Sequence, residues 1–209
     1  MSVQVSIYGK LPAHADFVSV NLANAIEVQL HEWISSVIFE TQNYFEKRDW
    51  LNAYLNISPL CFLLNLDSSD KDYLFGVMVP SVDRVGRYFP LVAGVYLTNK
   101  NESKFFDKEL LTCIGSAIVE EQVKAMHDHY QVDRLHDNII SLQALQTFQH
   151  THYAITTYFS INSINESLEK NPIISSCWWE LDNPDQMIET MKLPSSNFYQ
   201  SILSRGIKT

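Results

Sequence analysis

The sequence has only three cysteines, which are too few and too widely spaced for a disulfide framework. Cys61, Cys113 and Cys177 are odd in number and lie far apart in a chain of 209 residues. Because a protein without paired cysteines suits a reducing compartment, we expect a cytoplasmic protein.

Basic residues are scarce as well. Lysine and arginine number 15 against 24 aspartates and glutamates, which gives a formal net charge of −9 and a pI near 5.1. No long run of lysine or arginine reverses this charge locally. An acidic surface repels phosphate backbones and anionic lipid, so the composition disfavours nucleic-acid binding and attachment to a membrane surface.

Long apolar runs are also missing. Stretches such as 60–64 and 77–79 are far shorter than the roughly 18 apolar residues that a membrane-spanning helix needs. The first residues, MSVQVSIYGK, lack the basic segment followed by an apolar run that marks a secretory signal. We therefore expect a soluble protein without membrane insertion.

The chain does contain enough apolar material for a core. Hydrophobic residues make up 46% and aromatic residues 12%, while charged residues make up 19%, which argues against disorder. A chain of this length forms one large domain or two small ones. We predict a single domain over 1–209, with core elements between about 3 and 181 and a helical tail over 184–209.

Residue patterns predict a first strand, a helical region, three strands in a row and then further helices and strands. Apolar and β-branched runs predict strands over 3–8, 60–66, 73–79, 91–98, 153–161 and 175–181. Apolar residues at spacings of three and four predict helices over 22–37, 48–55, 110–118, 133–148 and 184–191. Asn21 is a candidate N-cap of the first helix, and we predict loops up to about residue 20 and over 163–172.

The connections between the three middle strands are short, which favours an antiparallel meander over parallel crossovers. The predicted fold class is therefore α+β, a mixed α/β domain in which helices pack on a mostly antiparallel sheet.

Motifs of well-known active sites are incomplete in this chain. Gly9 and Lys10 follow a predicted strand, as in a phosphate-binding loop. That motif also needs glycine where Gln4 stands and serine or threonine where Leu11 stands. The nucleophile elbow of serine hydrolases, glycine-x-serine-x-glycine, does not occur. We predict no catalytic residue and no cofactor.

The histidines give no complete metal site. His31 begins a segment like the helix of zinc proteases, but Ser35 stands where the second histidine ligand would be. His150 and His152 would share one face of a strand and could bind a metal together, although histidines at the surface are the more common case. We predict no metal ligand.

Three segments carry residues that ordinary loop or strand positions do not need. They are GKLPAHADF at 9–17, PSVDRVGRYFP at 80–90 and SCWW at 176–179. The candidate partner-binding or motif residues in them are Gly9, Lys10, Pro12, Asp16, Phe17, Ser81, Asp83, Arg84, Gly86, Arg87, Phe89, Trp178 and Trp179.

The second segment connects two predicted strands, where a short polar turn would suffice. It carries two arginines, Arg84 and Arg87, and Gly86 between them permits a positive φ angle. Arginine and aromatic residues on an exposed loop are typical anchors for a protein partner. The same arginines could instead pair with Asp16 or Asp83 and lock two loops together, and both roles remain open.

The two tryptophans of the third segment are neighbours on a predicted strand, so their side chains face opposite sides. We expect one of Trp178 and Trp179 in the core and the other over a helix or against a partner. A binding face would then expose some of Lys10, Arg84, Arg87 and one tryptophan.

Together the three segments resemble the TagF (ImpM) family of type VI secretion system-associated proteins. The family pattern is G-K-L-P-x-x-G-D-F, a helical region, P-S-V-D-x-x-G-R-x-F-P and a later S-x-W-W, and the order and approximate spacing agree from Gly9 to Trp179. Ala15 stands where the family usually has glycine. Val20 stands where an arginine is often found, so a role for that arginine is not carried over.

The resemblance implies a cytosolic accessory protein that represses type VI secretion post-translationally by binding the forkhead-associated scaffold protein of that system. It also implies an α/β domain without known catalysis. Two alternatives stay open. The chain is a structural or assembly component of the secretion machine, or it is an enzyme with an unrecognised site around Asp16, Asp83, Arg84 and Arg87, with His14 nearby.

Overall fold

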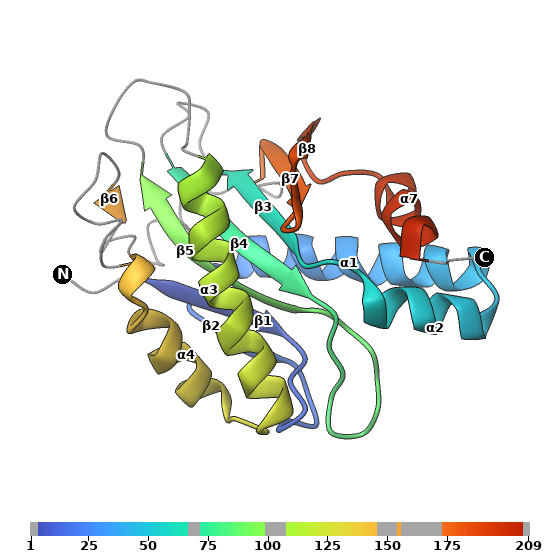
Figure 1. Cartoon of the computed structure of the whole chain (residues 1–209), viewed down its shortest axis with the longest axis horizontal. Helices are drawn as coiled ribbons and strands as arrows, with labels where there is room; N and C mark the ends of the chain where they lie inside the picture. The colour runs from blue at the N-terminus through green and yellow to red at the C-terminus, as the bar shows by residue number, and fades with distance from the viewer. Residues whose placement is uncertain (1–3, 67–71, 99–107, 146–153, 156–172, 207–209) are drawn as a thin grey trace.

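One antiparallel sheet forms the centre of the protein (Figure 1). The computed structural model describes residues 4–66, 72–98, 108–145, 154–155 and 173–206. The sheet has eight strands in the order β2-β1-β5-β4-β3-β7-β8, with β6 paired to β5, and every pairing is antiparallel. The predicted α+β fold with a mostly antiparallel sheet is confirmed.

The strands are β1 (Val5–Gly9), β2 (Val18–Val20), β3 (Leu60–Asn65), β4 (Asp72–Val79), β5 (Leu91–Thr98), β6 (Ala154–Ile155), β7 (Ser175–Glu180) and β8 (Asn183–Met191). The helices with described bounds are α1 (Asn24–Tyr44), α2 (Lys47–Asn56), α3 (Lys108–His127), α4 (Val132–Ile140) and α7 (Ser196–Gly206). None of the described helices is long and apolar enough to cross a membrane.

Helices cover both faces of the sheet. One core lies between the sheet and α1, α2 and α7, and the other lies between the sheet and α3 and α4 (Figure 1). Along β3, Leu60 and Phe62 belong to the first core and Cys61 to the second, because successive side chains of a strand point to opposite faces. A strand that is buried on both faces needs an apolar residue at nearly every position, which explains the continuous apolar run of β3.

The start of the first helix differs from the prediction. Asn21 does not cap α1, which begins at Asn24 with Ala23 at the N-cap position and no side-chain cap. The backbone of Asn21 instead has a positive φ of 51°, and its side-chain amide donates a hydrogen bond to the carbonyl of Val5 (3.2 Å). The residues just before it form the edge strand β2, where we predicted a loop.

The predicted helix over 184–191 is wrong, because these residues form the edge strand β8. The pattern misled because Met187, Ile188 and Met191 have the spacing of a helical face. In the structure they lie on an exposed strand that pairs with β7. Pro184 is tolerated there because the outer side of an edge strand has no neighbouring strand, so the missing backbone N–H of proline costs no hydrogen bond. The predicted helical tail is therefore reduced to α7, which begins after Pro194.

Several predictions fall partly outside the described residues. Of the strand predicted over 153–161, residues 154–155 form β6, and the remaining positions lie outside, as do the loop predicted over 163–172, Phe148, His150 and His152. The helix predicted from Asp133 is α4, which ends at Ile140, while Leu145 beyond it is buried in the same core.

Trp178 and Trp179 are both in the interior, each 1% exposed. Of the two alternatives given for the second tryptophan, contact with a partner is therefore wrong, and packing between the sheet and its helices is what the structure shows. They face opposite layers, as predicted. Trp178 packs on Trp33 and Phe62 with ring centroids 5.0 Å and 5.1 Å apart, and Trp179 stacks on Phe75 at 6.0 Å.

We expect Trp178→Ala to lower the free energy of unfolding by about 3–5 kcal/mol, because it leaves a cavity in the first core. Urea denaturation followed by circular dichroism measures this loss. Tyr44→Ala removes an aromatic ring that is 66% exposed and should change stability by less than about 1 kcal/mol. Equal losses in the two variants would contradict the packing described here.

Candidate functional site

Two of the three motif segments meet at the ends of two neighbouring interior strands of the sheet. The loop 10–17 follows β1, and the loop 80–90 precedes β5, and these two strands are paired with Gly9 opposite Leu91. Gly9 has a φ of 125°, and a Cβ atom there would overlap the carbonyl oxygen of Pro90. Glycine is therefore required where the two loops leave the sheet.

The loop 80–90 is a small hairpin organised by the carboxylate of Asp83. Its Oδ1 accepts hydrogen bonds from the backbone N–H groups of Val85 (3.0 Å) and Arg87 (2.9 Å). Val82 and Tyr88 form a β-bridge, and the N–H of Gly86 donates to the carbonyl of Asp83 (3.0 Å). Gly86 has a φ of 87°, so the predicted positive φ angle is present.

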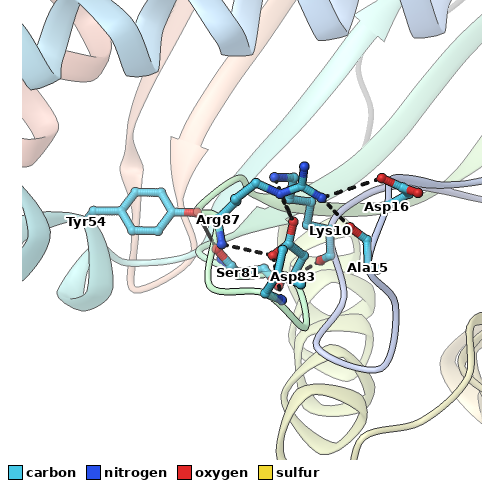
Figure 2. A network of polar contacts seen from close by, with 8 residues as sticks. Lys10, Ala15, Asp16, Tyr54, Ser81, Asp83 and Arg87 are labelled. Carbon is cyan, nitrogen blue, oxygen red and sulfur yellow. Dashed lines mark hydrogen bonds and ion pairs between the residues drawn. The ribbon is translucent and has the colours of Figure 1, made fainter.

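The other oxygen of Asp83 holds two cations. Lys10 Nζ lies 3.0 Å and Arg87 Nε 2.6 Å from Oδ2, and the Asp83 side chain is 0% and the Lys10 side chain 7% exposed. Arg87 then reaches across to the other loop, where its Nη2 donates to the carbonyl of Ala15 and lies 3.5 Å from Asp16 (Figure 2). The predicted lock between the loops is therefore present, and it is made by Arg87.

The buried carboxylate stays charged. Burial alone would raise the pKa of Asp83, but the hydrogen bonds from the Arg87 N–H, the Lys10 ammonium, the Arg87 guanidinium and the Val85 N–H outweigh it. The pKa of Asp83 is therefore held well below the usual range of an aspartate. The same contact with Asp83 raises the pKa of Arg87, so both partners are ionised at neutral pH.

Neutral hydrogen bonds fix the rest of the hairpin. The hydroxyl of Ser81 donates to the carbonyl of Lys10 (2.7 Å). The hydroxyl of Tyr54, on α2, contacts both the N–H and the carbonyl oxygen of Ser81 at 3.0 Å (Figure 2). Nothing in the local pattern of α2 pointed to Tyr54, because its partner lies in a loop distant in sequence.

His14 ties the first loop to a second helix. Its carbonyl accepts from the N–H of Arg84 (2.9 Å), and its ring Nε2 accepts from the N–H of Val132 at the start of α4 (3.2 Å). A ring nitrogen placed at a helix N-terminus satisfies a donor that has no partner inside the helix. In this structure the side chain of His14 therefore has a positioning role.

A cluster of aromatic rings packs against the loops 10–17 and 80–90. Phe17 packs edge-on against Phe89 with centroids 4.8 Å apart, and the Lys10 ammonium lies 5.1 Å from the Phe17 ring centroid. Tyr8 and His31, which form a 2.5 Å hydrogen bond, complete this cluster. Phe89 is buried, whereas Phe17 is 43% exposed.

The network leaves a defined set of side chains at the surface. Phe17, Arg84, Val85, Arg87 and Tyr88 are exposed, and we call them the loop face. In the described part of the chain the guanidinium of Arg84 has no hydrogen bond or ion pair. Of the residues predicted for a binding face, both arginines are exposed, whereas Lys10, Trp178 and Trp179 are buried.

The remaining candidates have structural positions. Ser81 is buried under the hairpin, and Pro12 lines a shallow hollow of about 460 Å³ together with Asp83, Arg84 and His129. Among the described residues, no three histidine, cysteine, aspartate or glutamate side chains are grouped closely enough to hold a metal ion.

Comparisons with known proteins agree with this arrangement. A family model described as the TagF N-terminal domain, type VI secretion system-associated, matches residues 6–142, which include both loops of the site. The crystal structure of PA0076 from Pseudomonas aeruginosa PAO1 is similar, with a TM-score of 0.63 and 20% identity over 96% of this chain and 94% of that chain. At this identity the likeness shows a shared fold. A comparison with curated proteins found no significant match.

We expect Asp83→Asn to lower the free energy of unfolding by about 3 kcal/mol, because it leaves the Lys10 charge buried without its partner. Urea denaturation at neutral pH measures the effect. The matched control is Asp185→Asn, which breaks the exposed pair with Lys108 and should change stability by less than about 1 kcal/mol. An Asp83→Asn protein as stable as the control would refute the network.

The stability that Asp83 contributes should depend on pH. Because its folded-state pKa is lowered, this contribution is complete above the ordinary pKa of aspartate, about 4, and is lost as the pH falls below it. We therefore expect the difference in unfolding free energy between the wild type and Asp83→Asn to narrow from about pH 5 to about pH 3. A difference that stays constant over this range would contradict an ionised Asp83.

Proposed function

Because the chain belongs to the TagF family of type VI secretion system-associated proteins, we propose that it is a cytosolic regulator that acts by protein binding. Its partner is the forkhead-associated scaffold protein of the secretion system, and binding represses secretion post-translationally. The loop face is the contact surface. The observation that carries this proposal is the buried Asp83 network, which holds exposed arginine and aromatic side chains in fixed positions.

The properties of the loop face support binding. Arginine and aromatic residues are enriched among the residues that dominate protein interfaces. Side chains that are already ordered lose less conformational entropy when a partner binds, and the hairpin is ordered by hydrogen bonds to Asp83, Ser81 and Tyr54. The side chain of Arg84 has no partner in the described chain, so its guanidinium is available to a carboxylate of another protein.

The same network argues for binding in preference to catalysis at this place. A general acid or base needs a carboxyl group whose proton can be exchanged with a substrate. Asp83 is fully enclosed and already accepts from Lys10, Val85 and Arg87, and its pKa is lowered. Asp16 is exposed and lies at the outer end of the chain of contacts through Arg87. These mutually paired groups support a structural role for the cluster.

The sign of the effect on secretion separates a repressor from a structural component. Deletion of a repressor raises secretion of a type VI substrate, whereas deletion of a structural part abolishes it. Unchanged secretion on deletion would reject a repressor role for the chain.

We expect Arg84→Glu to weaken binding to the purified scaffold protein by at least about tenfold and to raise secretion as the deletion does. Isothermal titration calorimetry measures the affinity, and a secretion assay in the native host measures the effect. The fold should be retained, because the contact of Arg84 with His14 uses only the backbone N–H.

The matched control is Arg48→Glu, which makes the same charge change at an exposed position of α2. It should leave both affinity and secretion unchanged. Equal effects of the two variants would show that net charge, and not the loop face, governs binding. Arg87→Ala is less informative, because it also releases Asp83 and the carbonyl of Ala15.

A further inference from the structure

A separate pocket opens beside the hairpin, between Tyr88 and the helices α1 and α2. Its volume is about 300 Å³, and it is lined by Gln42, Lys47, Trp50, Leu51 and Tyr88. Lys47, Trp50 and Leu51 have the spacing of one helical face, so α2 presents them together. The volume is at the lower end of the roughly 300–1,000 Å³ of ligand pockets, which suits one large side chain.

The apolar walls of this pocket are held in place by internal contacts. The indole N–H of Trp50 donates to the hydroxyl of Thr41 (3.0 Å), and the ring stacks on Tyr54 with centroids 5.0 Å apart. Tyr88 lies edge-on to both rings, at 6.2 Å and 5.8 Å. A pocket with fixed walls binds an apolar group with little rearrangement.

The pocket and the loop face belong to one rigid unit. Tyr54, which supports the Trp50 ring, is the residue whose hydroxyl holds Ser81 at the base of the hairpin. Tyr88 is both a wall of the pocket and an exposed residue of the loop face. A partner segment that crosses the hairpin therefore meets the pocket next.

The charged residue that lines the pocket is a cation. Lys47 is exposed and forms no ion pair within the described chain, and Gln42 offers a neutral amide. The acidic residues of this turn, Glu46 and Asp49, do not line the pocket. An apolar pocket with a cation at its mouth complements an apolar side chain that has a carboxylate beside it.

We infer that this pocket receives a leucine or aromatic side chain from an acidic segment of the partner protein, with Lys47 paired to a neighbouring carboxylate. The inference rests on the proposed function for the identity of the partner. It goes further in naming the anchor, its place on the surface and the chemistry of the segment that binds.

The pocket can be tested without the partner. The probe is a short acetylated peptide with one leucine followed by aspartates, and its binding is followed by the NMR signal of the Trp50 indole N–H, assigned with Trp50→Phe. We expect a saturable shift that is lost with alanine for the leucine or lysines for the aspartates. No shift at high peptide concentration would overturn the inference.

Two pairs of variants then test the pocket against the purified scaffold protein. Gln42→Trp fills the pocket from an exposed position, and Asn43→Trp adds the same ring at an adjacent exposed position outside the lining. Lys47→Glu reverses the charge at the pocket, and Arg48→Glu does so beside it. We expect about a tenfold or greater loss of affinity for the first member of each pair and less than about twofold for the second.

The outcomes separate this inference from the proposed function. If the scaffold protein binds and Arg84→Glu weakens it while the pocket variants do not, the proposed function stands and the inference is overturned. If the scaffold protein does not bind the wild type, the proposed partner is wrong. In that case the peptide experiment tests the pocket alone. A shift of the Trp50 signal that Gln42→Trp and Lys47→Glu abolish supports the pocket as an anchor site. The absence of a shift overturns the inference.

Discussion

The charge of Asp83 cannot remain in the protein interior without partners, and satisfying it determines the shape of the whole site. Two backbone N–H groups, the Lys10 ammonium and the Arg87 guanidinium converge on one carboxylate. Because each donor offsets part of the cost of burying this charge, the contacts fix the hairpin and the loop 10–17 relative to each other. Arg87 also continues to the carbonyl of Ala15. The exposed residues of the loop face are held on this framework.

Arg84 and Arg87 have different roles because of this constraint. Arg87 is one of the groups that neutralise Asp83, so it has a large share in the folding of the site, and its guanidinium is already engaged by Asp83 and the carbonyl of Ala15. Arg84 contributes only its backbone N–H to the framework, through His14. Chemically identical side chains three positions apart thus separate into a scaffold residue and a contact candidate, and only the three-dimensional structure distinguishes them.

Much of the architecture could be predicted from local pattern. The meander β3-β4-β5 followed from short connections between apolar runs, and the segments 9–17 and 80–90 were identified by residues that plain turns do not need. Long-range burial could not be predicted. A strand pattern shows that Trp178 and Trp179 face opposite ways, but not that both faces are covered by helices. In the same way, Lys10 is buried only because Asp83 arrives from a distant loop, and β8 forms because β7 offers it an edge.

The pairing of Gly9 with Leu91 joins parts of the chain that are made at different times. During synthesis the first loop emerges long before β5, and until β5 pairs with β1 the Lys10 ammonium has no carboxylate to meet. The surface that a partner would recognise therefore cannot exist on a nascent or partly unfolded chain, since it depends on contacts of high sequence separation. The proposed contact surface is therefore complete only once the centre of the sheet is complete.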